Sequence, residues 1–167
     1  MNGMTETEKN LWEALVGEAK ATVRLKSFAD QAEQDGYPQV AKLFRAVSAA
    51  EFIHATRCLR LLGIIRSTEE NLEKSFESET LVSENHYPAF VKQAEADGNN
   101  AARLAFTHAK DAEEFHAKLY KQAMSDLAAE RDSSFQVCQV CGYVVDGEPP
   151  EECPVCGAKR KMFTAVV

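Results

Sequence analysis

Apolar residues recur at every third or fourth position through residues 6–129, which is the spacing of amphipathic helices. Thr5 and Glu8 match the capping-box pattern that opens a helix, and Ser67 and Glu70 match it again. A helix is therefore expected to begin just after Thr5 and another just after Ser67. This period is lost after the first 130 residues or so.

Glycine and proline predict where the helices end. Gly36 followed by Pro38 predicts a break between the first and second helices. Gly63 ends the second helix, and Gly98 separates the third from a fourth that runs to about residue 129. Pro88 lies inside the third helix, where a missing N–H predicts a kink or irregular turn near Tyr87.

The helical part of the sequence is an internal repeat. Residues 28–55 align with residues 90–117 without a gap, and each copy contains a glycine-broken helix pair that carries Glu-x-x-His. Two copies at so long a period are too few for a solenoid. The repeat predicts two helical hairpins that build one four-helix bundle.

Each Glu-x-x-His places a carboxylate and an imidazole on one face of a helix, within an apolar stripe. A charged residue in such a stripe is costly unless it is paired or binds metal. The other two helices each carry one glutamate in an equivalent stripe. The candidate ligands are Glu18, Glu51, His54, Glu79, Glu113 and His116. Four carboxylates balance two divalent ions, and oxygen-rich ligation with one imidazole per metal favours iron or manganese.

Composition excludes several classes of protein. The net charge of −7 argues against nucleic-acid partners and acidic membrane surfaces. No apolar run approaches the roughly 20 residues of a membrane span, and the first ten residues lack the apolar core of a signal peptide. The chain has five cysteines, and four of them form two Cys-x-x-Cys pairs, which predicts metal binding in a reducing cytoplasm.

The paired cysteines predict a tetrahedral sulfur site in a small second domain. Its four ligands are Cys138, Cys141, Cys153 and Cys156. A glycine follows the second cysteine of each pair and lets the backbone turn its N–H groups toward sulfur. The spacing fits structural zinc as well as an iron that carries one electron. The predicted organisation is a helical domain over residues 1–130, a linker over 131–136 and a metal domain over 137–167.

These motifs together resemble the rubrerythrin family over the whole chain. The residues that carry the resemblance are Gly17-Glu18, Glu51 to His54, Asn71-Leu72 with Glu79, Tyr87-Pro88, Glu113 to His116 and the four paired cysteines. The resemblance implies an all-α ferritin-like four-helix bundle that holds an oxo- or hydroxo-bridged di-iron site. It also implies a small rubredoxin-like domain with one four-cysteine iron.

The resemblance further implies a cytoplasmic peroxidase that reduces hydrogen peroxide to water in oxidative stress defence. Electrons would come from NAD(P)H through a separate reductase, often via rubredoxin, to the four-cysteine iron. Within the bundle, Glu51 and Glu113 would bridge the irons, Glu18 and His54 would complete one, and Glu79 and His116 the other. Tyr87 would either donate a hydrogen bond to a terminal carboxylate or satisfy the backbone that Pro88 leaves free.

The chain departs from the family pattern at two positions that bear on the peroxidase mechanism. Val82 stands three residues after Glu79, where members usually carry another metal-binding glutamate, and Leu25 stands where a tyrosine is common. Two other functions therefore stay open. One is a ferroxidase, iron-storage or dioxygen-reducing bundle, and the other is a structural module with zinc in its tail.

The connection between the hairpins bears on the oligomeric state. If both hairpins of one chain formed one bundle, the chain would have to return about 28 Å along it, measured at about 1.5 Å per helical residue. An extended Gly63–Asn71 stretch would just cover that distance at about 3.3 Å per residue. A homodimer is expected, and a link this tight leaves open a domain-swapped one, in which the hairpins of two chains share a site.

Overall fold

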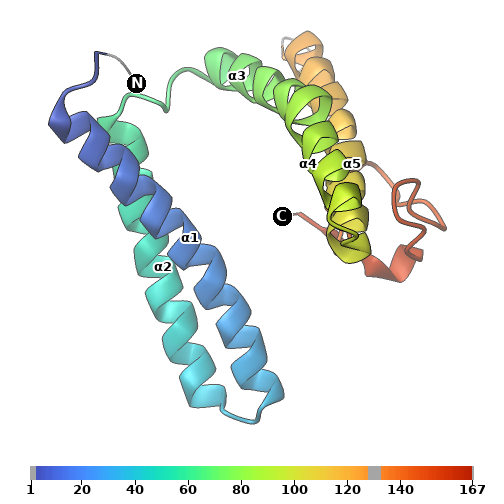
Figure 1. The fold of residues 1–167 in the computed structure, drawn as a ribbon, viewed down its shortest axis with the longest axis horizontal. Coiled ribbons are helices and arrows are strands. Elements are labelled where there is room, and N and C mark those ends of the chain that lie inside the picture. Colours follow the sequence, from blue (N-terminus) through green and yellow to red (C-terminus); the bar gives the residue numbers. More distant parts are fainter. Residues whose placement is uncertain (1–2, 128–132, 167) are drawn as a thin grey trace. The chain divides into compact units, whose positions relative to one another are not determined.

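The computed structural model describes residues 3–127 and 133–166. The chain is mostly helical and ends in a small three-stranded sheet (Figure 1). It divides into two compact units between Arg66 and Ser67. None of the described helices combines the length and the apolar composition that a membrane crossing requires.

The first unit is an antiparallel hairpin of α1 (Glu6–Gln34) and α2 (Pro38–Leu61) (Figure 1). The predicted capping box is confirmed, because the Glu8 amide donates to Thr5 Oγ1 at 3.2 Å and the Thr5 amide donates to the Glu8 carboxylate at 2.7 Å. Gly36 has a φ of 80°, which a residue with a side chain rarely adopts, and this turn lets α2 fold back along α1.

Small side chains let α1 and α2 pack closely. The buried residues at one end of their interface are Ala29, Ala32 and Ala41. Nearer the middle, the buried Ser48 hydroxyl donates to the Thr22 carbonyl oxygen at 2.9 Å and joins the two helices directly. This bond fixes the helices at the level where the predicted ligands of the hairpin lie.

The second unit begins with a helix that is interrupted by one wide turn. Its helical elements are α3 (Thr68–Leu81), a π-helical turn (Val82–His86), α4 (Tyr87–Ala96) and α5 (Asn100–Asp126). The irregularity predicted from Pro88 therefore lies just before Tyr87, whose N–H bonds the Val82 carbonyl five residues back. Pro88 has no N–H to continue the α-helical pattern, so one turn of the helix widens.

The tail of the second unit is a three-stranded antiparallel sheet. Its strands are β1 (Phe135–Cys138), β2 (Val144–Asp146) and β3 (Phe163–Ala165), in the order β2-β1-β3. The predicted end of the last helix at residue 129 and part of the predicted linker 131–136 lie outside the described residues, so these boundaries stay predictions. The core of the tail is Cys138, Tyr143 and Cys153, packed directly against α5 by way of Phe115.

Candidate metal centres

The first unit gathers one set of predicted ligands. Glu18 comes from α1, and Glu51 and His54 come from α2. His54 Nδ1 lies 2.9 Å from Glu51 Oε2 and 4.0 Å from Glu18 Oε1. One ligand atom from each residue lies within 4.8 Å of the others, which is the spacing that a shared metal ion needs.

The second unit gathers the equivalent set. Glu79 comes from α3, and Glu113 and His116 come from α5, again with ligand atoms within 4.8 Å of one another. His116 Nδ1 lies 2.7 Å from Glu113 Oε2. The repeat in the sequence therefore produces two half-sites, each with two carboxylates and one imidazole.

The carboxylates of the second half-site crowd one another in the absence of a cation. Partial burial, a hydrogen bond with Glu113 and the negative charge of Glu113 raise the pKa of Glu79 to about 7, against the opposing effect of His116. Partial burial, followed by the charges of Glu113 and Glu79, also raises the pKa of Tyr87. A divalent cation would relieve this repulsion, so the donor set fits the metals predicted from the sequence.

Tyr87 lies beside the second half-site, but within the described chain its hydroxyl makes no hydrogen bond to either carboxylate. Its ring packs edge-on against Phe90 at 5.9 Å between centroids and lies 6.4 Å from Phe106. The role predicted for Tyr87 therefore stays a prediction.

The wide turn after Glu79 is held by a buried serine. Ser83 is 3% exposed, and its hydroxyl donates to the Glu79 carbonyl at 2.7 Å. Val82, at the position where the family usually has a further glutamate, begins this turn and is half-buried. The π-helical turn thus begins three residues after the predicted ligand Glu79 and changes the register of the residues beyond it.

The four cysteines of the tail converge as predicted. Sγ of Cys138 lies 3.7 Å from Sγ of Cys156, and Sγ of Cys141 lies 3.6 Å from Sγ of Cys153. A tetrahedron with metal–sulfur bonds of about 2.3 Å has edges of about 3.8 Å, so the sulfur cage has the size that a single metal ion requires.

Backbone N–H groups surround this sulfur cage. Burial would raise the pKa of Cys138, but N–H groups of Val140 and Cys141 that donate to its sulfur lower the pKa overall. Burial raises the pKa of Cys141, although the N–H of Tyr143 donates to its sulfur. Burial also raises the pKa of Cys156, although the N–H of Ala158 donates to its sulfur. Such N–H groups stabilise thiolates, and a bound cation would add to their effect.

One contact joins the tail to the second half-site, and the sequence did not predict it. His116 Nε2 lies 2.9 Å from the carbonyl oxygen of Gly142. A carbonyl oxygen only accepts, so Nε2 carries the hydrogen and Nδ1 is the nitrogen available to a metal. Gly142 directly follows Cys141, one of the four predicted sulfur ligands.

Aromatic packing reinforces that contact. The Phe115 ring meets the Tyr143 ring edge-on at 4.8 Å between centroids, and Tyr143 is 8% exposed. Lys118 Nζ lies 4.7 Å from the centre of the Phe115 ring. In the sequence, this contact is indicated only by where the two aromatic residues stand. Phe115 lies inside the second Glu-x-x-His motif, and Tyr143 directly follows the Cys-Gly of the first cysteine pair.

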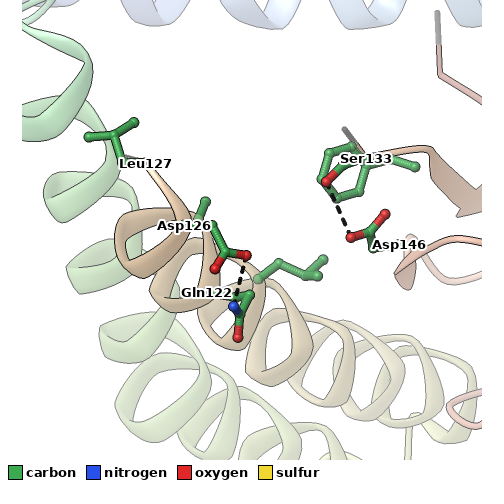
Figure 2. A pocket seen from close by; sticks show the side chains of 8 residues that line it. Gln122, Asp126, Leu127, Ser133 and Asp146 are labelled. Atoms are coloured by element: carbon green, nitrogen blue, oxygen red, sulfur yellow. Dashed lines mark hydrogen bonds between the residues drawn. The ribbon is translucent and has the colours of Figure 1, made fainter. Parts of the chain in front are cut away.

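A hollow of about 320 Å³ lies beside this junction, between the end of α5 and the tail. Figure 2 shows Gln122 donating to Asp126 on one wall and Ser133 donating to Asp146 on the other. The remaining lining is mostly apolar and includes Leu119. The hollow adds no further metal-ligand cluster to the three found among the described residues.

Comparisons with known proteins identify the family of this chain. Residues 9–124 match the rubrerythrin family, and residues 136–164 match the rubrerythrin rubredoxin-like domain. Nigerythrin of Nitratidesulfovibrio vulgaris is 36% identical over 95% of this chain and 86% of its own length. Rubrerythrin of the same organism is 30% identical over 95% of this chain and 93% of its own length.

Solved structures give the same result. A mixed-valence nigerythrin structure matches with a TM-score of 0.59 and 35% identity, over 99% of this chain and 88% of that one. The chain therefore belongs to the rubrerythrin family of di-iron proteins, with a ferritin-like helical domain followed by a small rubredoxin-like domain in which four cysteines lie close together.

Proposed function

We propose that this protein is a peroxidase that reduces hydrogen peroxide to water at a di-iron site and receives electrons through a four-cysteine iron site. The observation that carries the proposal is the double contact of His116. Its Nδ1 belongs to the carboxylate cluster, at 2.7 Å from Glu113, and its Nε2 lies 2.9 Å from Gly142 O. His116, a predicted ligand of the di-iron site, is thus one hydrogen bond away from Gly142. Gly142 directly follows Cys141, a predicted ligand of the four-cysteine site.

The protein would hold two irons with its six predicted ligands. Glu51 and Glu113 would bridge them, because each stands at the same place in its copy of the repeat. Glu18 and His54 would complete the coordination of one iron, and Glu79 and His116 would complete that of the other. The Nε2–H of His116 is engaged by Gly142, so the ring is held with its other nitrogen toward the metal.

Reduction of one hydrogen peroxide to two waters requires two electrons and two protons. When bound, the two irons would supply both electrons, and the four-cysteine iron would return them one at a time. Tyr87 would turn its hydroxyl toward Glu79 or Glu113, since both charges already act on it, and would hold a proton near the reacting oxygens. The carboxylates would keep the metals close enough to share one substrate.

A complete site needs both half-sites, and helix lengths favour a homodimer with exchanged hairpins. α2 ends about 10 Å beyond the level of His54, and α3 begins about 16 Å before the level of Glu79, at about 1.5 Å per residue. A bundle within one chain would need residues 62–67 to span about 27 Å. They reach at most about 25 Å from Leu61 to Thr68.

The electron donor would be a separate protein, such as a rubredoxin or an NAD(P)H-dependent reductase. Thiolate ligation in the tail favours the reducing cytoplasm as its location. Removal of peroxide in that compartment would be part of oxidative stress defence.

The test is anaerobic. The iron-loaded protein would be fully reduced and mixed with hydrogen peroxide or with dioxygen, while the visible band of the ferric four-cysteine site is followed. Fast return of the band with peroxide, and much slower return with dioxygen, is expected. Glu113→Ala should abolish the fast phase, whereas the neighbouring Glu114→Ala should keep it.

A preference for dioxygen, or slow reoxidation by both oxidants, would overturn the proposal. That result would favour a ferroxidase or an oxidase. Val82 would then be the residue to examine, because a valine there gives the site one oxygen ligand fewer than the family usually has.

A further inference from the structure

The two cysteine knuckles of the tail, residues 138–143 and 153–158, are built alike. In the first, the Cys138 amide donates to the Tyr143 carbonyl and the Gly142 amide to the Cys138 carbonyl, each at 2.9 Å. In the second, the Cys153 amide donates to the Ala158 carbonyl at 2.7 Å, and the Gly157 amide to the Cys153 carbonyl at 2.9 Å. The knuckles would therefore present their metal to the outside in equivalent ways.

Their surroundings are not equivalent. The first knuckle is occupied by this chain's own α5, since His116 bonds the Gly142 carbonyl and Phe115 packs on Tyr143. At the matching places of the second knuckle, Gly157 is exposed and Ala158 is half-buried. Within the described chain, no hydrogen bond reaches the Gly157 carbonyl.

The surface of the second knuckle is uncharged. Residues 154–158 contain no ionisable side chain other than the ligand Cys156, and Pro154 is exposed. The charged side chains next to it form ion pairs with one another. Lys159 pairs with Glu152, and Arg160 pairs with Glu151 at 3.1 Å.

Solvent exposure alone does not distinguish the two knuckles, because the first is also exposed in part: its Val140 is 53% exposed. The difference lies on the side of each knuckle that holds the glycine carbonyl. On the first, that side already faces His116, a ligand of the second half-site. On the second, the Gly157 carbonyl accepts no hydrogen bond from the described residues and Gly157 is exposed. The path from this carbonyl to the sulfur cage is equally short.

We propose that the second knuckle is the surface where the electron donor docks, so that electrons enter through residues 153–158 and leave through residues 138–143. This inference rests on the proposed function. The partner is a one-electron carrier protein with an uncharged, mainly apolar face. In the step itself, the donor loses one electron, the ferric four-cysteine iron becomes ferrous, and no bond is formed or broken.

The repeat within the tail supplies a matched pair of variants for the test. Pro154 and Gln139 each follow the first cysteine of a knuckle, and both side chains are exposed. Pro154→Glu and Gln139→Glu add the same charge at equivalent distances from the iron. Pro154→Lys and Gln139→Lys form a second pair with the opposite charge.

Each full-length, iron-loaded variant would be mixed with a reduced flavoprotein reductase as the protein donor, and loss of the ferric band would be timed at a wavelength where the flavin does not absorb. Both Pro154 variants should lower the second-order rate constant by about ten-fold, whereas both Gln139 variants should stay within about two-fold of wild type. The reduction potential of the tail iron should change equally in the two members of a pair. Reduction by dithionite should differ little between them.

Equal losses in the two pairs, or a larger loss at Gln139, would overturn the inference. Effects of opposite sign for Glu and Lys would also overturn it, because they would indicate a charged rather than an apolar docking face. These rates concern reduction alone. Failure of peroxide to reoxidise wild-type protein would instead reject the proposed function and leave this comparison intact.

Discussion

The imidazole of His116 and the carbonyl of Gly142 are joined by a hydrogen bond of 2.9 Å between Nε2 and O. Because His116 is also part of a carboxylate cluster, this bond couples the position of the tail to that of a predicted metal ligand. The tail is therefore docked on α5 and does not act as an independent module.

Phe115→Ala should weaken the docking of the tail. Loss of a half-buried ring and its edge-on contact with Tyr143 should lower the free energy of unfolding by about 1–3 kcal/mol. Peroxide-driven return of the four-cysteine band should slow, while the spectrum of that site keeps its shape. Urea unfolding and stopped-flow absorbance would measure the two effects.

The internal repeat provides the control for that variant. Ile53 holds the place equivalent to Phe115 in the first copy and is 65% exposed. Ile53→Ala should leave the reoxidation rate close to that of wild type. Equal slowing in both variants would mean that Phe115 acts on the helices in general and not through the tail.

Exchange of hairpins can be tested with two inactive variants. Glu51→Ala disables the first half-site and Glu113→Ala the second. A swapped heterodimer of the two would contain one site with both half-sites intact, so it should recover about half the activity of the wild-type dimer. Co-expression with two affinity tags would isolate this heterodimer for a peroxidase assay. An inactive heterodimer would show that each chain builds its own site.

Removal of the tail metal should loosen the tail selectively. Its strands are short, and the sulfur cage is at the centre of its small core, so much of its stability should come from the bound ion. Hydrogen exchange of amides in residues 135–165 should accelerate after chelation, whereas amides in the buried part of α1 should be unaffected. Unchanged protection in the tail would mean that its apolar contacts with α5 suffice.

The pKa of Glu79 predicts how stability varies with pH in the metal-free protein. It is raised from 4.5 to about 7, so the folded state keeps a proton that the unfolded state has already lost between these values. The stabilising effect is complete below pH 4.5 and disappears as the pH rises through about 7. The free energy of unfolding should therefore fall across this window.

Glu79→Gln isolates that contribution because glutamine keeps the shape but does not titrate. Urea unfolding of metal-free protein at several pH values should show a smaller decrease in the variant than in wild type. The same decrease in both proteins would assign it to other groups.

Most local features could be predicted from the sequence because they depend on residues close together in the chain. The capping boxes at Thr5 and Ser67 are present, and α2 begins at Pro38 as expected. The irregular turn was expected from Pro88, but its place at Val82–His86 depends on which carbonyls find partners in the folded helix. The spacing of apolar residues does not indicate which of these hydrogen bonds will form.

The sequence alone determined the types of the predicted metal ligands and how they group. Glu and His three residues apart must share a helix face, and paired cysteines at this spacing must turn their sulfurs together. Only the tertiary structure decided that Gly142 meets His116 while Gly157, in an identical local setting, stays exposed. The physical reason is that docking on α5 depends on the shapes of distant surfaces, here the rings of Phe115 and Tyr143, which no local pattern encodes.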